Sequence, residues 1–304
     1  MKVAITGATG FVGSRLVERL VEAGHQVVVL TRSVSKAEQR FPQAEFPSLE
    51  FVAYSPETLA EWQGVICQCQ GVINLAGEPI AEKRWSVDQK NEILNSRVDT
   101  TRSLVQAIEQ AESKPQVFVS GSAIGYYGTS ETATFDEGSG PGDDFLAEVC
   151  KQWEAEAQKV SDGVRLVILR IGVVLDNGGA VAKMLPAFRA FAGGPIGSGR
   201  QWFSWVDRED LVSLIIQALT DGQMQGAYNA TSPNPVTMKQ MTDSLGEVMG
   251  RPSWMPVPGF ALELLLGEGA KVVLEGQKVM PKQTQASGFE YEYGELKDSL
   301  KRFV

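Results

Sequence analysis

The sequence predicts an α/β protein with a doubly wound parallel sheet and a smaller C-terminal lobe. Two observations support this fold class. Short apolar segments of strand length alternate with helical segments, which is typical of a parallel sheet that is covered on both faces. A glycine-rich turn also follows the first of these strands directly. The chain has 304 residues, of which 43% are hydrophobic, and it can therefore bury a sizeable core.

The N-terminal strand and the turn after it carry the strongest signal in the sequence. Residues 3–13 read VAITGATGFVG, an apolar strand that runs into three evenly spaced glycines. Gly7 permits a tight turn, Gly10 lets the backbone approach a phosphate, and Gly13 lets the next helix pack against the strand. A helix that begins near Phe11 would direct its free N–H groups and its positive dipole end at phosphates. This pattern indicates a dinucleotide-binding turn of Rossmann type, and the alternative is a glycine-rich turn in another kind of α/β protein.

The end of the second strand indicates which dinucleotide the turn would bind. Arg32 follows the apolar segment 27–31, and the next acidic residue is Glu38. A site for NAD usually has an acidic residue in this region, which accepts a hydrogen bond from the ribose 2′-hydroxyl. A guanidinium can instead bind a 2′-phosphate through two hydrogen bonds, each worth about 1.5–3 kcal/mol when charge-assisted. We therefore expect NADP(H), preferred roughly ten- to a hundredfold; the alternative is that Arg32 is a solvated surface charge.

The rest of the chain supplies the other strands and helices of such a sheet. Apolar strands are predicted at residues 49–53, 71–77, 117–120 and 166–171, and helices at 88–110 and 144–160. We assign residues 1–171 to a dinucleotide-binding Rossmann domain. A glycine-rich loop and several prolines follow, so residues 172–304 are assigned to a smaller substrate-binding lobe. This lobe is expected to be partly interleaved with the main sheet, through a strand at 226–230.

The carboxyl ends of the parallel strands predict where a ligand binds, because ligands of open α/β sheets lie in the crevice outside those ends. The residues that we expect to contact the cofactor come from the first turn, from the end of the second strand and from the strand that ends near residue 77. They are Gly7, Thr9, Gly10, Phe11, Val12, Gly13, Arg32, Leu75, Ala76 and Gly77.

Charge and composition exclude several classes of function. The formal net charge is −9 and no basic run offsets it, which disfavours a nucleic-acid-binding surface. The first strand begins by Val3, so no signal peptide is expected, and the apolar stretch 260–266 is too short to span a bilayer. Three cysteines without metal or redox spacing fit a reducing, cytoplasmic setting. His25 is the only histidine, so a histidine metal cluster is excluded, a Ser-His-Asp triad is not supported, and no metal is expected.

Several motifs occur in an order and spacing that resemble a known superfamily. They are Thr6–Gly13, Asn74–Gly77, Ser120–Ser122 with Tyr127–Gly128, Gly193–Gln201 and Ser232–Val236. Through them the chain resembles an atypical extended short-chain dehydrogenase/reductase of the epimerase-family group, related to NAD-dependent epimerases and dehydratases. The resemblance implies a Rossmann fold, bound NADP and ancestry among enzymes that act on sugar nucleotides. It also implies a link to plastid or cell division, because plant and cyanobacterial relatives are often described in that way.

One part of the superfamily pattern is absent from this chain. The catalytic Tyr-x-x-x-Lys pair should open the helix near residue 145, where the sequence has Leu146 and Cys150. The literal match from Tyr293 to Lys297 lies far along the chain from the nicotinamide strands. A tyrosine without the lysine has a pKa of about 10 and is roughly 0.1% ionised at pH 7, an offset of about 4 kcal/mol. Oxidation of an alcohol needs a base, whereas reduction of a carbonyl needs only a proton donor, so the pattern favours NADPH-driven reduction or no catalysis at all.

Three hydroxyl side chains are candidates for the catalytic role. Ser122 ends a strand beside the expected nicotinamide and could bind a carbonyl oxygen, and the alternative is a hydrogen bond within its loop. Tyr126 or Tyr127 could donate a proton, and the alternative for each is packing with a satisfied hydroxyl group.

Four further residues are candidates for substrate binding. Lys83, Arg84 and Trp85 follow a strand end and could line the substrate pocket, whereas a solvated face is the alternative. Arg200 follows the glycine-rich loop, where related enzymes hold a sugar-nucleotide diphosphate. The sequence thus predicts an NADP(H)-binding reductase or epimerase-like oxidoreductase for a small carbonyl or sugar-nucleotide substrate, as a monomer or homodimer. The alternative is a non-catalytic dinucleotide-binding regulator, linked to cell or plastid division.

Overall fold

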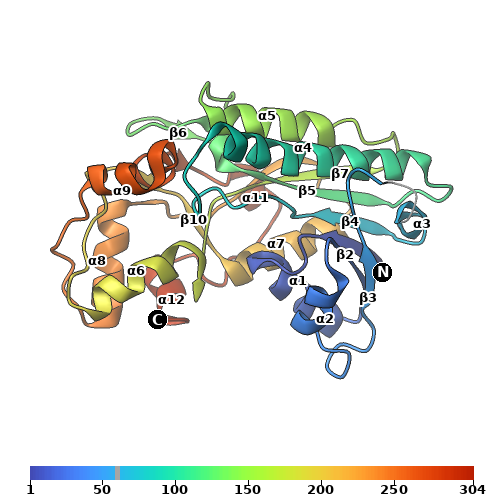
Figure 1. Cartoon of the computed structure of the whole chain (residues 1–304), viewed down its shortest axis with the longest axis horizontal. Coiled ribbons are helices and arrows are strands. Elements are labelled where there is room, and N and C mark those ends of the chain that lie inside the picture. Colours follow the sequence, from blue (N-terminus) through green and yellow to red (C-terminus); the bar gives the residue numbers. More distant parts are fainter. Residues whose placement is uncertain (59–61) are drawn as a thin grey trace.

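The centre of the protein is a seven-stranded parallel sheet, seen in a computed structural model that describes residues 1–58 and 62–304 (Figure 1). The strands lie in the order β11-β7-β5-β4-β1-β2-β3. Their bounds are β1 Lys2–Thr6, β2 Gln26–Thr31, β3 Glu50–Ala53, β4 Gly71–Asn74, β5 Val117–Ala123, β7 Arg165–Ile171 and β11 Gly226–Ala230. This is the doubly wound α/β sheet that the sequence predicts, and the fold class is confirmed.

Helices cover both faces of this sheet. On one face lie α1 (Phe11–Glu22), α2 (Val34–Arg40) and α7 (Arg208–Thr220), and on the other lie α3 (Gln63–Ile66), α4 (Val87–Gln110) and α5 (Phe145–Ala157). The period of two along each strand divides the side chains between the faces: Val3 and Ile5 join the first cluster, whereas Ala4 joins the second.

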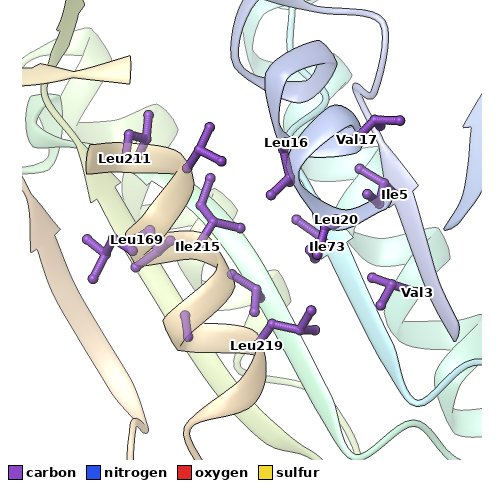
Figure 2. Close-up of a cluster of buried hydrophobic side chains, with 14 of the residues drawn as sticks. Val3, Ile5, Leu16, Val17, Leu20, Ile73, Leu169, Leu211, Ile215 and Leu219 are labelled. Carbon is purple, nitrogen blue, oxygen red and sulfur yellow. The ribbon is translucent and has the colours of Figure 1, made fainter. Parts of the chain in front are cut away.

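The buried face of α1 and α7 shows how the sequence holds this layer together. Figure 2 shows Leu16 and Leu20 of α1 beside Ile5 and Ile73 of the sheet, with Ile215 of α7 in the same cluster. Each of these side chains is fully buried. Burying one Leu or Ile stabilises the fold by about 1.5–3 kcal/mol, so the apolar stripe of each helix fixes its position over the strands.

The strand order reverses at β1, and this reversal positions the site. From β1 the chain proceeds outward to β2 and β3, and it then crosses back to β4 and β5 on the other side of β1. In the register of these strands Thr6 lies opposite Leu30 on β2 and opposite Asn74 on β4. The carboxyl ends of β1 and β4 therefore meet at a topological switch point, where open α/β sheets bind ligands.

The remaining elements follow β7 and, apart from α7 and β11, lie outside the main sheet. Several of them form a separate apolar cluster that includes Leu185, Trp205 and Leu245. In Figure 1, α6, α8, α9 and α12 gather at one end of the molecule, away from α2 and α3. The helices are α6 Gly179–Arg189, α8 Met238–Met249, α9 Gly259–Leu266, α10 Lys271–Leu274, α11 Lys282–Ala286, α12 Leu296–Lys301 and the 3-10 turn η3 Gly267–Ala270. The short strands after β7 are β8 Val173–Asp176, β9 Trp202–Phe203, β10 Trp205–Asp207, β12 Val236–Thr237 and β13 Lys278–Val279. One further short strand, β6 (Thr134–Phe135), precedes β7.

The strand expected at residues 226–230 is β11, which pairs in parallel with β7 at the edge of the main sheet. In the part of the chain that the structure describes, no helix combines the length and the apolar character needed to cross a bilayer.

Candidate functional site

The glycine turn between β1 and α1 has the geometry of a tight, exposed backbone loop. Gly7 has a positive φ of 72°, and its carbonyl accepts a hydrogen bond from the amide of Gly10 at 3.0 Å. A Cβ on Gly13 would overlap the carbonyl oxygen of Gly7, so a glycine is required for α1 to pack on the turn. Thr9 and Gly10 are exposed, and α1 begins at Phe11 with no acidic residue in its first turn. The start of this helix is therefore open to an anion.

The turn lies directly against the end of β4. A Cβ on Gly7 would come within 2.6 Å of the carbonyl carbon of Leu75. Asn74 ties the two strand ends together, because its buried Oδ1 accepts from the Thr6 hydroxyl at 2.7 Å and from the Ala76 amide at 3.3 Å. Leu75, Ala76 and the exposed Gly77 are thus held beside the glycine turn, as the cofactor prediction requires.

Three further predicted cofactor residues lie on α1 or directly after β2. The Phe11 ring packs against Gly178, where a Cβ would lie within 2.6 Å of the ring. Arg32 is exposed at the end of β2, and Glu38 lies on α2. Val12 is partly buried against the core beside α1. The end of β2 is therefore followed by an exposed guanidinium, whose charge helps to lower the pKa of the Glu78 carboxyl on the segment after β4.

The end of β5 leads into a buried polar network rather than into an open pocket. Ser122 is 2% exposed, and its hydroxyl donates to Glu154 Oε1 on α5 at 2.7 Å. Arg170 of β7 donates to both oxygens of the same carboxylate, at 2.9 and 2.8 Å. Arg170 also donates to the Tyr127 hydroxyl at 2.9 Å, and Tyr127 donates to Asn229 Oδ1 at 2.7 Å. The hydroxyls of Ser122 and Tyr127 are therefore both committed to partners inside the protein.

Electrostatics in this network keep Tyr127 protonated. Burial raises the pKa of Tyr127 to about 12, although the Arg170 guanidinium beside it acts in the opposite direction. Burial alone would lower the pKa of Arg170, but its hydrogen bonds to Glu154 and the carboxylate charge raise it above the ordinary value. Tyr127 is therefore a neutral phenol at physiological pH, and its hydroxyl donates a hydrogen bond to Asn229 Oδ1.

Tyr126 has a different environment from its neighbour. Both tyrosines belong to the 3-10 turn η2 (Ile124–Tyr127), but Tyr126 is partly exposed. The Arg170 guanidinium lies over the Tyr126 ring, 3.6 Å from its centroid. Within residues 1–58 and 62–304, no side chain or backbone group forms a hydrogen bond with the Tyr126 hydroxyl. Of the two tyrosines, Tyr126 therefore has the proton that no internal acceptor holds.

The residues at the positions of the missing Tyr/Lys pair are apolar or inert. Leu146 packs against Gly125, where a Cβ would be 3.3 Å from the Leu146 Cβ. Burial raises the pKa of the Cys150 thiol to about 12, so Cys150 is not a nucleophile at neutral pH. The literal Tyr-x-x-x-Lys lies elsewhere: Lys297 pairs with Glu247 of α8.

The segment after β4 connects the two parts of the chain. Lys83 donates to Glu78 Oε1 at 2.7 Å, and this hydrogen bond lowers the pKa of the Glu78 carboxyl. Arg84 donates to the carbonyl of Leu264 on α9 at 3.3 Å. Trp85 donates from Nε1 to its own loop, and its ring packs edge-on against Phe145 at 5.2 Å. Arg84 and Trp85 thus contact the α9 segment, whereas Lys83 is paired within its own loop.

Arg200 stands apart from these residues. Its side chain is 75% exposed and lies 3.4 Å from the Glu131 carboxylate, without a contact to the β4 segment in the described structure. The described residues also contain no cluster of three His, Cys, Asp or Glu side chains that could hold a metal ion.

The sequence reasoning missed Glu154, Arg170 and Asn229, which build the network around Ser122 and Tyr127. A signal for two of them was present. Arg170 interrupts the apolar run 166–171, and Glu154 lies on the helix face that also carries Cys150 and Trp153. Charged residues on buried faces need a partner, so this pair could have been proposed from the pattern.

Comparisons with known proteins agree with this geometry. Residues 3–231 match the NAD dependent epimerase/dehydratase family, and residues 257–303 match a domain of unknown function. The chain is 52% identical to the Epimerase family protein SDR39U1 homolog, chloroplastic, of Arabidopsis thaliana, over 100% of this chain and 87% of that protein. It is 38% identical to the Epimerase family protein YfhF of Bacillus subtilis, over 100% of this chain and 98% of that protein.

Two solved structures are also similar. The human epimerase family protein SDR39U1, crystallised with NADPH, has a TM-score of 0.87 and 34% identity, over 100% of this chain and 99% of that chain. A nucleoside-diphosphate sugar epimerase from Corynebacterium glutamicum has a TM-score of 0.76 and 30% identity, over 99% of this chain and 57% of that chain. With the glycine turn, the strand order and these similarities in agreement, the chain belongs to the NAD dependent epimerase/dehydratase family.

Proposed function

We propose that the chain binds NADP(H) at the glycine turn, with Arg32 on the 2′-phosphate of the adenosine half. The observation that carries this proposal is the exposed turn at Thr9 and Gly10, which opens onto the start of α1 while Arg32 stands at the next strand end. Gly7 and Gly13 keep this turn compact, since a Cβ at either position would collide with the backbone of the turn itself or of Leu75. The NADPH in the human relative supports the same assignment.

We infer further that the chain reduces a carbonyl group rather than epimerising a sugar. When bound, NADPH supplies the hydride. The chain must then supply a proton, and Tyr126 is placed at the end of β5 with a hydroxyl that no described residue binds. Ser122 and Tyr127 hold this end of the strand in place through Glu154 and Arg170. The absence of a Tyr/Lys base at Leu146 and Cys150 favours reduction, because a neutral phenol can donate a proton but cannot readily accept one.

The substrate class is a small carbonyl compound or a sugar nucleotide. The similarity to a nucleoside-diphosphate sugar epimerase supports the second. Lys83, Arg84 and Trp85 offer positive charge and an aromatic surface where the C-terminal part meets the sheet, which would suit a phosphorylated substrate. Arg200 would reach only an extended substrate, because its side chain lies out in solvent.

Binding is tested by titrating the protein with NADPH, and activity by substrate-dependent NADPH consumption with panels of carbonyl compounds and sugar nucleotides. We expect Tyr126→Phe to abolish turnover while NADPH still binds. Tyr127→Phe is the matched control: it should lose stability, since it breaks two buried hydrogen bonds, but keep measurable turnover. Loss of turnover in Tyr127→Phe alone would instead make Tyr127 the proton donor.

A second function, a dinucleotide-binding regulator without catalysis, is favoured by one observation, the inert pair Leu146 and Cys150. Saturable NADPH binding with no consumption across the panels would support it. Interconversion of sugar epimers without an external reductant would contradict both functions.

A further inference from the structure

Arg97 of α4 lies directly beneath Gly77, at the carboxyl end of β4. A Cβ on Gly77 would come within 2.9 Å of the Arg97 Cζ, so the glycine leaves the space that the guanidinium fills. Arg97 Nη1 donates to the carbonyl of Ile93 at 2.9 Å, and Cζ lies 5.3 Å from the ring centroid of Trp153 on α5. The side chain is thus fixed between β4, its own helix and α5.

Arg97 has no direct ion pair among the described residues, because none of their carboxylates lies within ion-pair distance of its guanidinium. The Glu78 carboxylate acts on its charge from a longer distance and is itself paired with Lys83 at 2.7 Å. Arg102, one turn further along α4, pairs with Asp99 and Glu156, and Arg170 pairs with Glu154. Burial lowers the pKa of Arg97, but a guanidinium remains protonated in proteins at neutral pH. A partly buried charge without a counter-ion is costly, and such a group is a candidate for a functional role.

The position of Arg97 places this charge at one end of the proposed cofactor site. Arg32 marks the adenosine end at β2, and the start of α1 marks the phosphates next to β1. Because β4 and β5 lie on the opposite side of β1 from β2, the nicotinamide half must extend over the ends of β4 and β5. Gly77, which covers Arg97, ends this segment of β4.

Arg97 also lies next to the helix turn that lacks the usual lysine. Trp153, whose ring it faces, is one turn along α5 from Cys150, and α4 packs against α5 along its length (Figure 1). The chain therefore has no lysine at Cys150 on α5, and it carries a guanidinium without a direct ion pair on the neighbouring helix.

We propose that Arg97 selects the reduced cofactor: its positive charge at the nicotinamide end favours NADPH, whose ring is neutral, over NADP⁺, whose ring is positively charged. This inference rests on the proposed NADP(H) function. It adds that the site favours the reduced cofactor, and therefore reduction of the substrate. Repulsion between like charges in a partly desolvated site weakens NADP⁺ binding without a matching effect on NADPH. The same repulsion would assist release of the oxidised product after reduction of a carbonyl.

Equilibrium binding tests the proposal without any substrate. The dissociation constants of NADPH and NADP⁺ are measured by calorimetry for the full chain and for Arg97→Met, Arg97→Gln and Arg97→Lys. Arg102→Met is the matched control, because it removes a half-exposed arginine from the same helix, and Glu156, one of its two partners, keeps an ion pair with Lys159. We expect the wild type and Arg102→Met to bind NADPH roughly tenfold more tightly than NADP⁺. Arg97→Met and Arg97→Gln should bring this ratio close to one, and Arg97→Lys should keep it.

The outcomes separate the two proposals. A wild-type ratio near one, or an unchanged ratio in a folded Arg97→Met or Arg97→Gln protein, overturns the role of Arg97 but leaves NADP(H) binding intact. If the ratio of the two dissociation constants also falls to one in Arg102→Met, the role of Arg97 is overturned, because loss of any positive charge on α4 would then have the same effect. If neither form of the cofactor binds to the wild type, the proposed function itself is wrong, and this inference fails with it. Far-UV circular dichroism identifies any variant that does not fold.

Discussion

The buried pair between Arg170 and Glu154 allows a quantitative test of the site's architecture. The two residues are each 5% exposed and are joined by two hydrogen bonds. Removing one partner of such a pair leaves an uncompensated charge in the interior, which costs about 3–5 kcal/mol. We therefore expect Glu154→Leu and Arg170→Met each to lower the free energy of unfolding by about that amount, out of a typical total of about 5–15 kcal/mol.

The double variant should lose much less than the sum of the single variants. With both charges replaced by apolar groups, the remaining defect is a Ser122 hydroxyl without its acceptor and a Tyr127 hydroxyl without its Arg170 donor. Unsatisfied buried groups of this kind cost about 1–3 kcal/mol. Taken at the middle of these ranges, the double-mutant cycle should therefore give a favourable coupling energy of about 4 kcal/mol.

Urea unfolding followed by circular dichroism measures all four free energies. Lys151→Met with Glu148→Leu is the matched control cycle, because this pair is exposed on α5 and should couple by less than about 1 kcal/mol. A coupling between Arg170 and Glu154 as small as the control value would refute the reasoning. Single variants that lose less than about 1 kcal/mol would do so too, since the charges would then be hydrated rather than buried.

Two further predictions concern the cofactor site. Arg32→Ala should weaken NADPH binding roughly ten- to a hundredfold and leave NADH binding almost unchanged, as fluorescence titration would show; equal losses for both would contradict a contact with the 2′-phosphate. Gly13→Ala should lower the melting temperature and abolish NADPH binding, because a Cβ there overlaps the Gly7 carbonyl, whereas Gly64→Ala, where an added Cβ would meet no atom of the described residues, should change neither. A Gly13→Ala protein with wild-type stability and affinity would contradict the close packing of the turn.

The sheet and the glycine turn could be predicted because their signals are local. Residues 3–13 contain the strand, the turn and the start of α1 in one continuous segment, and the structure places α1 at Phe11–Glu22. The helix expected at 88–110 is α4, Val87–Gln110, because its apolar period fixes its buried face over a long stretch. In each case neighbouring residues determine the conformation, and the rest of the chain does not override it.

The sequence signals the buried charges of Glu154 and Arg170, but the complete polar network could not be predicted, because its members come from four separate segments. Ser122, Glu154, Arg170 and Asn229 belong to β5, α5, β7 and β11, which only the strand order brings together. The sequence offers Tyr126 and Tyr127 as equal candidates. Their difference arises from tertiary contacts alone, since Asn229 accepts the proton of Tyr127 and no described residue accepts that of Tyr126.

Arg170 and Arg97 both lie near strand ends, but they differ in whether a carboxylate pairs with the guanidinium. Arg170 lies in the interior with a carboxylate on two of its nitrogens, so its charge is cancelled and its effect is to fix Tyr127 and the end of β5. Arg97 has the same chemistry and only a backbone carbonyl as acceptor, yet the fold keeps it against Gly77. A fold that needed only packing there could place a methionine beside Trp153 without the desolvation of a charge. This guanidinium, which has no direct ion pair among the described residues, supports our proposal that a neutral reduced nicotinamide binds above Gly77 more tightly than a cationic one.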